Sequence, residues 1–128
     1  MLKRIAALGL LLLAGVAALA APQARHIITP QPRTPRRATL DPASFKDPET
    51  RKAYQVARDK PVLLEKMACY CGCMGSVEDH TSNLECFADN HGQGCALCRR
   101  IALEAAEMDA RGIPADKIKR EIDNRYAK

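Results

Sequence analysis

The chain has 128 residues, of which 20 are basic and 15 acidic, and its formal charge is +5. Six basic residues and one acidic residue precede residue 45, whereas residues 45–128 carry 14 of each sign. The excess positive charge therefore lies outside the part of the chain that we expect to fold, and we expect no nucleic-acid partner.

Residues 1–20 have the pattern of a secretory signal peptide. Two basic residues, Lys3 and Arg4, precede an apolar run that ends in the small residues Ala18, Leu19 and Ala20. We expect cleavage after this run and export to the periplasm or the extracellular space, with an uncleaved membrane anchor as the alternative. No cysteine follows the small residues, so we expect no lipid anchor. The cysteines of an exported chain mature in an oxidising environment.

Residues 21–44 are predicted to form a disordered tether rich in proline and arginine. They contain four arginines and five of the eight prolines of the chain, with a single acidic residue. Such a segment cannot bury enough apolar surface to fold alone. Its arginines give it at most a weak attraction to an anionic membrane surface.

Residues 45–128 are predicted to form one small all-α domain with irregular cysteine-rich loops. The first helix begins well at Asp47, a good capping residue, and Pro48, which suits the first turn. Pro61 ends this helix, which should therefore run to about Asp59.

Two short elements are expected in the middle of the domain. The apolar run at residues 62–67 leads into the cysteine-rich part as either a strand or a helical turn. A short helix through Phe87 should follow, with Thr81 or Ser82 as its capping residue.

A longer helix is predicted from Cys95 to about Arg111, where Gly112 closes it. Spacings of three and four residues place both Cys95 and Cys98 on its buried stripe. That stripe comprises Cys95, Cys98, Ala102, Ala105 and Met108.

A last helix follows Pro114, with Ile118 and Ile122 facing inward. The core of the domain is thin, because the whole chain has no tryptophan, two phenylalanines and three tyrosines. A core of this kind usually needs a staple, so we expect metal or disulfides to hold the domain together.

All six cysteines lie within residues 69–98, and three of them alternate in the sequence Cys69-Tyr70-Cys71-Gly72-Cys73. Side chains at alternate positions of an extended segment share a face, so these three thiols can converge on one ion. Two histidines fall among the cysteines and could add nitrogen ligands. The candidate metal ligands are Cys69, Cys71, Cys73, Cys86, Cys95, Cys98, His80 and His91.

This order of cysteines and histidines resembles the bacterial PCYCGC-motif family of exported proteins. The similar part runs from about Tyr54 to Ala106, and Ala68 stands where the family has its leading proline. The resemblance implies an exported protein with a cysteine-rich site. It implies no particular activity, because the family has none that is firmly established.

Three uses of the cysteines remain open. A thiolate-rich site favours copper(I) or zinc, and six thiols exceed one tetrahedral site, so either two ions share bridging thiolates or one disulfide accompanies a four-ligand site. Disulfide scaffolding is the second use, although bridges between the alternating cysteines would be strained. The third is thiol–disulfide exchange at Cys95 and Cys98, whose C-x-x-C spacing at a helix start suits a dithiol oxidoreductase.

The sequence therefore favours an exported protein that is not an enzyme and that binds copper(I) or zinc for sequestration or delivery at the cell envelope. An envelope metal-handling or redox protein would be its partner. The alternatives are a disulfide-stapled binding module without metal and a thiol–disulfide oxidoreductase.

Overall fold

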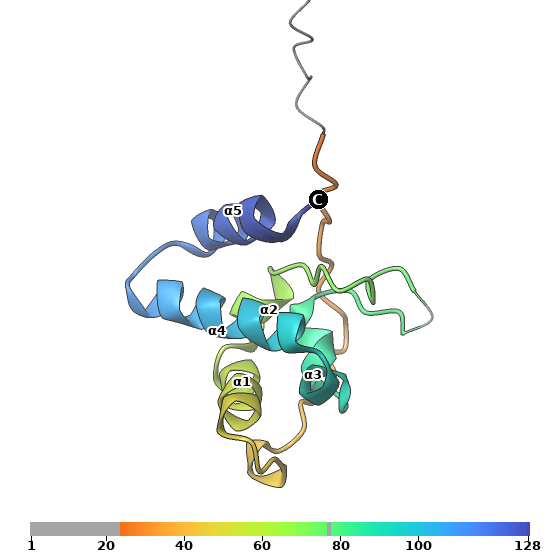
Figure 1. The fold of residues 1–128 in the computed structure, drawn as a ribbon, viewed down its shortest axis with the longest axis vertical. Coiled ribbons are helices and arrows are strands. Elements are labelled where there is room, and N and C mark those ends of the chain that lie inside the picture. Colours follow the sequence, from red (N-terminus) through yellow and green to blue (C-terminus); the bar gives the residue numbers. More distant parts are fainter. Residues whose placement is uncertain (1–23, 77) are drawn as a thin grey trace, which may run out of the picture.

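A computed structural model describes residues 24–76 and 78–128 of the chain (Figure 1). The described residues form helices and connecting loops, and their only β-type pairing is an isolated bridge between Met74 and His80. The predicted all-α class is confirmed. In chain order the elements are η1 (Pro42–Ser44), α1 (Pro48–Asp59), α2 (Pro61–Glu65), η2 (Asn83–Phe87), α3 (His91–Gly94), α4 (Ala96–Ala110) and α5 (Ala115–Tyr126), where η denotes a 3₁₀-helix.

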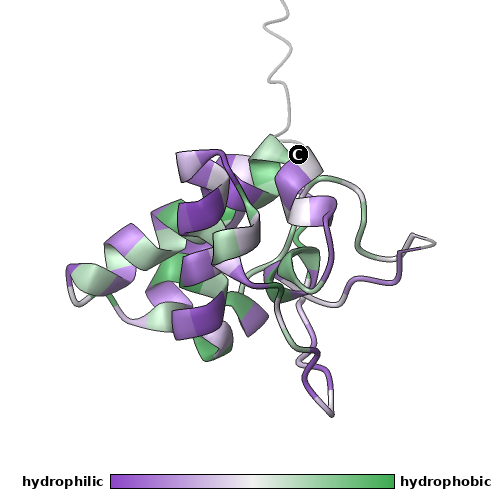
Figure 2. Cartoon of the chain, turned by 90° about the horizontal axis from the view of Figure 1, so that it is seen from below, coloured by the Kyte–Doolittle hydropathy of each residue, from purple (hydrophilic) through white to green (hydrophobic). Residues whose placement is uncertain are grey.

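Helix α4 lies at the centre of the domain and packs against α1 on one side and α5 on the other (Figure 1). The loop that carries the alternating cysteines projects beyond one end of α4, between α2 and η2 in the chain. The long helices carry hydrophilic and hydrophobic residues on different sides, as expected of helices that cover a small core (Figure 2). None of the helices among the described residues is long and apolar enough to span a bilayer.

Helix α1 forms as the sequence predicts. The Asp47 carboxylate accepts a hydrogen bond of 2.7 Å from the backbone N–H of Thr50, which caps the helix, and Pro48 occupies the first turn. The helix buries Ala53 and Tyr54 against the core. Local signals at its two ends thus determine where it lies.

The apolar run at residues 62–67 is helical rather than extended. Helix α2 begins at Pro61, which suits a first helical turn, and it buries Leu63 and Leu64. The short helix predicted through Phe87 is present as the 3₁₀-helix η2. Ser82 occupies its N-cap position, but the Ser82 side chain makes no capping hydrogen bond.

A helical turn, α3, lies where the sequence suggested only a glycine-containing connection. The Asp89 carboxylate accepts a hydrogen bond of 2.8 Å from the backbone N–H of His91 at the start of this turn. A Cβ atom on Gly92 would lie 2.9 Å from both the Cys86 carbonyl oxygen and the Phe87 ring. The glycine therefore permits α3 to approach η2 closely, which was not predictable from local propensity.

Helix α4 begins one residue later than predicted and ends near Gly112, whose φ of 78° suits the left-handed turn that follows. Cys98 lies on its buried stripe, as expected. The expectation for Cys95 is wrong: this residue is the half-buried N-cap of the helix and not part of the stripe. The helical period applies only to residues inside the helix, and Cys95 precedes the first of them.

Helix α5 follows Pro114 and buries Ile118 and Ile122, as predicted. The centre of the core is aromatic. The Tyr54 ring stacks on Phe45 at a centroid distance of 3.9 Å and meets Phe87 edge-on at 5.1 Å. The rest of the core consists of alanine, cysteine, leucine, isoleucine and methionine, and its four buried cysteines make the cysteine-rich site part of the core itself.

Residues 24–41 have almost no regular structure but lie along the domain (Figure 1). The Arg36 guanidinium donates two hydrogen bonds of 2.7 Å to the buried carboxylate of Glu65, and Arg33 donates one of 2.9 Å to buried Glu85. The sequence analysis treated this segment as a tether and did not anticipate these ion pairs. The predicted signal peptide, residues 1–20, lies outside the described residues.

Candidate metal centre

The loop that follows α2 gathers its three alternating cysteines on one side. The Sγ atom of Cys71 lies 3.2 Å from that of Cys69 and 2.8 Å from that of Cys73. Gly72 allows the tight curl, because its φ of 93° is a conformation that other residues rarely adopt. The backbone N–H of Cys69 also donates to Met74 Sδ across the loop at 3.1 Å. The three sulfurs thus lie close together, and their binding of one ion stays a prediction.

A fourth and a fifth cysteine reach the same place from other elements. Cys98 comes from the first turn of α4, and its Sγ atom lies 3.0 Å from Cys69 Sγ and 3.6 Å from Cys71 Sγ. Cys86 comes from η2, where it is fully buried. The Asn83 side chain donates to the Cys98 carbonyl oxygen at 3.2 Å and so ties η2 to α4.

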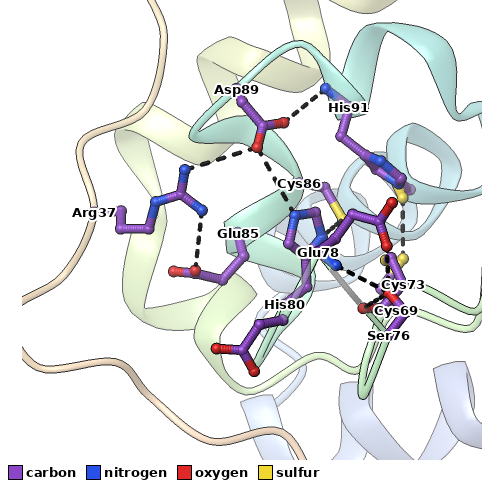
Figure 3. A network of polar contacts seen from close by, with 12 residues as sticks. Arg37, Cys69, Cys73, Ser76, Glu78, His80, Glu85, Cys86, Asp89 and His91 are labelled. Carbon is purple, nitrogen blue, oxygen red and sulfur yellow. Dashed lines mark hydrogen bonds and ion pairs between the residues drawn. The ribbon is translucent and has the colours of Figure 1, made fainter.

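Both histidines between the cysteines face the thiols, and their rings meet edge-on at 5.0 Å (Figure 3). His80 Nδ1 lies 3.6 Å from Cys86 Sγ, and His91 Nε2 lies 3.6 Å from Cys71 Sγ. Burial lowers the pKa of His91, but the hydrogen bond with Cys71 and the neighbouring thiolate charges outweigh burial and raise it.

Seven of the eight candidate ligands form three overlapping groups of four. Within each group the sulfur and nitrogen atoms that could bind a metal all lie within 4.8 Å of one another. The groups are Cys69, Cys73, Cys86 and Cys98; Cys71, Cys73, His91 and Cys98; and Cys73, His80, Cys86 and His91. All four cysteines of the first group are buried. The group therefore differs from clusters of exposed acidic side chains, which are common without a metal ion.

Cys95 is the candidate that the structure leaves out of these groups. Its Sγ atom accepts a hydrogen bond of 3.4 Å from the backbone N–H of Cys98, which makes it the N-cap of α4. The thiol of Cys98 points instead toward Cys69 and Cys71. The expected pairing of Cys95 with Cys98 as neighbouring ligands is therefore replaced by a cluster that includes Cys86.

Hydrogen bonds among the thiols separate their pKa values. The thiols of Cys69 and Cys73 hold the pKa of Cys71 far below its usual value, and Cys69 likewise lowers that of Cys73. Bonds to neighbouring thiols raise the pKa values of the more buried members, Cys69, Cys86 and Cys98. The lowered pKa values favour thiolate at Cys71 and Cys73, and thiolate is the form that binds metal.

A carboxylate network behind the histidines completes the site (Figure 3). Asp89 Oδ2 lies 3.9 Å from His80 Nε2 and 3.7 Å from an Arg37 nitrogen, while Oδ1 accepts from the backbone of His91. Arg37 also lies 3.4 Å from the buried carboxylate of Glu85. Sequence reasoning missed these residues, because nothing local marks a carboxylate that meets a histidine nine residues away.

The chain matches a family model described as a protein of unknown function with PCYCGC motif, over residues 38–128. The chain belongs to this family. The match covers the whole helical domain and the end of the segment that precedes it, and Ala68, which replaces the leading proline of the motif, is fully buried. No curated protein and no solved structure matches significantly. Membership confirms the resemblance seen in the sequence and brings no activity with it.

Proposed function

We propose that the chain is an exported protein that binds a soft metal ion, copper(I) or zinc, for sequestration or delivery at the cell envelope. The observation that carries the proposal is the convergence of four buried thiols, those of Cys69, Cys73, Cys86 and Cys98, within 4.8 Å of one another. Sulfur ligands at about 2.3 Å from a tetrahedral zinc ion lie about 3.8 Å apart, so small movements of these side chains accommodate the ion.

The chemistry of the donors fits soft ions rather than hard ones. Thiolate and imidazole suit copper(I) and zinc, whereas calcium and magnesium take oxygen ligands. Two carboxylates near the site have other partners: Asp89 lies behind His80, and Glu85 is bound to Arg33 and Arg37. A carboxylate behind a ligating histidine orients the ring and increases its basicity.

The degree of exposure supports exchange of the ion with a partner protein. Cys71 is half-buried at the edge of the cluster, whereas Cys69, Cys86 and Cys98 are inaccessible. A surface cavity of about 310 Å³ is lined in part by His26, Met74 and His80. An accepting protein could therefore approach the bound ion at the edge of the site.

Export is supported by the sequence of residues 1–20, with its basic start and its small residues before Ala21. N-terminal sequencing of the protein recovered from the envelope or the medium tests this part of the proposal. A start at Ala21 is expected. A start at Met1 in the membrane fraction would contradict it.

A competition titration tests metal binding. Purified, reduced protein is titrated with copper(I) and separately with zinc against a chromophoric chelator, as wild type, Cys98→Ser and Cys95→Ser. Replacing Cys98 should weaken binding by more than about 100-fold, since a hydroxyl is a poor ligand for a soft ion and even partners behind the ligands are worth 10–100-fold. Replacing Cys95, which lies outside the cluster, should leave the affinity nearly unchanged.

The competing hypothesis is a disulfide-stapled module. It is favoured by the 3.0 Å separation of the Cys69 and Cys98 sulfurs, which oxidation could convert to a bond between distant parts of the chain. If wild-type protein binds neither ion under reducing conditions, the metal proposal is wrong and this hypothesis takes its place. Equal affinities of wild type and Cys98→Ser would place the metal elsewhere.

A further inference from the structure

Two of the three ligand groups cannot serve one ion together. The four-sulfur group and the group that contains both histidines share Cys73 and Cys86, so their union offers six ligand atoms. Zinc in protein sites takes four ligands in a tetrahedron. Either one group is idle, or each group holds an ion of its own and the two shared sulfurs bind both.

We propose that the cluster holds two divalent ions of the zinc class, bridged by the thiolates of Cys73 and Cys86. Cys69 and Cys98 complete the tetrahedron of one ion, and His80 and His91 complete that of the other. The inference rests on the proposed function and specifies its stoichiometry, its ligands and the charge of its metal. A thiolate sulfur carries more than one lone pair, which allows it to bind two ions at once.

Charge favours two divalent ions over one. The four ligand thiolates and two divalent ions have a formal charge of zero, whereas the same four thiolates around one divalent ion leave a charge of −2. A thiolate at Cys71, whose sulfur lies 2.8 Å from that of Cys73, adds −1 in either case and so leaves the preference for two ions unchanged. The four sulfurs are almost inaccessible, with exposed fractions of 0% for Cys69, Cys86 and Cys98 and 4% for Cys73. A buried net charge is costly unless it is paired. Two copper(I) ions would leave −2 as well, so the charge of the site selects zinc over copper(I).

Arg37, the arginine drawn in Figure 3, is not free to balance that charge. Arg37 lies 3.4 Å from Glu85 and 3.7 Å from Asp89, and the second carboxylate contact of Glu85 is to Arg33 at 2.9 Å. These arginines thus neutralise carboxylates that are themselves buried or half-buried. The second metal ion is left to neutralise the thiolates.

The histidines are oriented for the second ion. The side chain of His80 is 1% exposed, with Nδ1 toward Cys86 Sγ and Nε2 toward the Asp89 carboxylate. The carboxylate on the Nε2 side favours the tautomer with its proton there, which leaves the Nδ1 lone pair facing the thiols for a metal. His91 brings Nε2 to the same side of the cluster, and its backbone N–H is fixed by the same aspartate.

Filling the cluster involves proton release and no electron transfer. Each of the four cysteines binds the metal as thiolate. A cysteine that is still protonated releases its proton to solvent as the sulfur–metal bond forms. Cys71 and Cys95 remain outside the two-ion set. The group of Cys71, Cys73, His91 and Cys98 is the single-ion alternative, and it requires Cys71.

Zinc stoichiometry under reducing, oxygen-free conditions tests the inference. Native mass spectrometry and zinc analysis should give two ions per chain for wild type, two for Cys71→Ser and one for the double variant His80→Ala/His91→Ala. His26→Ala is the matched control, because His26 is exposed and belongs to none of the groups, and it should keep two ions. One ion in wild type overturns the two-ion inference and leaves the proposed function standing. No zinc ion overturns the two-ion inference, and the proposed function fails as well if the same protein also binds no copper(I).

Cobalt(II) gives a second readout that needs no variant. With one equivalent the ion is isolated, whereas with two equivalents thiolate bridges couple the cobalt spins and lower the magnetic moment per ion. A fall in the moment between one and two equivalents supports bridging by Cys73 and Cys86. An unchanged moment at two equivalents, or two ions retained by the double histidine variant, contradicts it.

Discussion

The contact between α3 and η2 provides a sharp test of how the fold builds the site. A Cβ atom at position 92 would lie 2.9 Å from the Cys86 carbonyl oxygen and 2.9 Å from the Phe87 Cδ1 atom. Ordinary contacts of a Cβ are at least 3.4 Å, and the carbonyl belongs to the backbone, so α3 must move by about half an ångström. His91 precedes Gly92 in the chain, and Cys86 lies beneath it, so the movement separates two candidate ligands.

Gly92→Ala should therefore reduce both stability and metal affinity. Overpacking of this kind costs about 1–3 kcal/mol in the free energy of unfolding. Urea denaturation of the metal-loaded protein measures the loss, and chelator competition measures the affinity. Gly94→Ala is the matched control, because a Cβ there meets nothing within 4 Å, and alanine in a helical turn is worth up to about 1 kcal/mol over glycine. Equal stability and affinity of the two variants would refute the reasoning.

Three further predictions concern the surroundings of the site. Asp89→Asn should weaken metal binding by about 10–100-fold in competition titrations, because it removes the carboxylate behind His80, while Asp116→Asn on the exposed face of α5 should have no effect. Burial, reinforced by hydrogen bonds to carboxylates for the last two, raises the pKa values of Tyr54, to about 12, and of Tyr70 and Tyr126. A raised pKa means that the folded state favours the phenol over the phenolate. The resulting stabilisation of the fold is complete below pH 10 and is lost as the pH rises through the folded pKa values. Ultraviolet titration should show phenolate only together with loss of helix, and a phenolate transition near pH 10 with intact helix would contradict this. Circular dichroism should show that reductant and chelator together remove helix, because the thiols of the site are part of a thin core, whereas a full, cooperatively melting helix signal under these conditions would argue against that dependence.

Much of the helical framework was predictable because its signals are local. Asp47 caps α1 through a side-chain hydrogen bond, and Pro48 suits the first turn. Gly112, which has no side chain, adopts the left-handed conformation that follows α4. The buried faces of α1 and α5 follow from the spacing of apolar residues. Helix α3 escaped prediction because it depends on Gly92 meeting η2, a contact between elements.

The site was predictable in its residue types and less so in its partners. Alternation brought Cys69, Cys71 and Cys73 together as expected, because that pattern acts over five residues. Cys86 was among the expected ligands and lies in the cluster, whereas the position of Cys95 outside it depends on where α4 begins, which the sequence around Cys95 did not reveal. Whether these residues bind metal in the living cell stays a prediction.

The acidic partners of the N-terminal arginines illustrate the same limit. Composition alone favours a tether for residues 21–44, because proline and arginine bury little apolar surface. Glu65 and Glu85 favour a segment that lies against the domain, since each is buried there and accepts a hydrogen bond from a guanidinium of this segment. A carboxylate buried by packing cannot be recognised from the sequence around it.

Native mass spectrometry of protein purified from its own compartment tests the central claim most directly. A bound metal adds its mass, whereas each disulfide removes two hydrogens from the chain. We expect the folded protein to carry metal and to lose it under denaturing conditions, where the mass returns to that of a chain whose clustered thiols are reduced. A metal-free chain that lacks six hydrogens in both spectra would show that the cysteines form disulfides, and the metal-binding account would then be wrong.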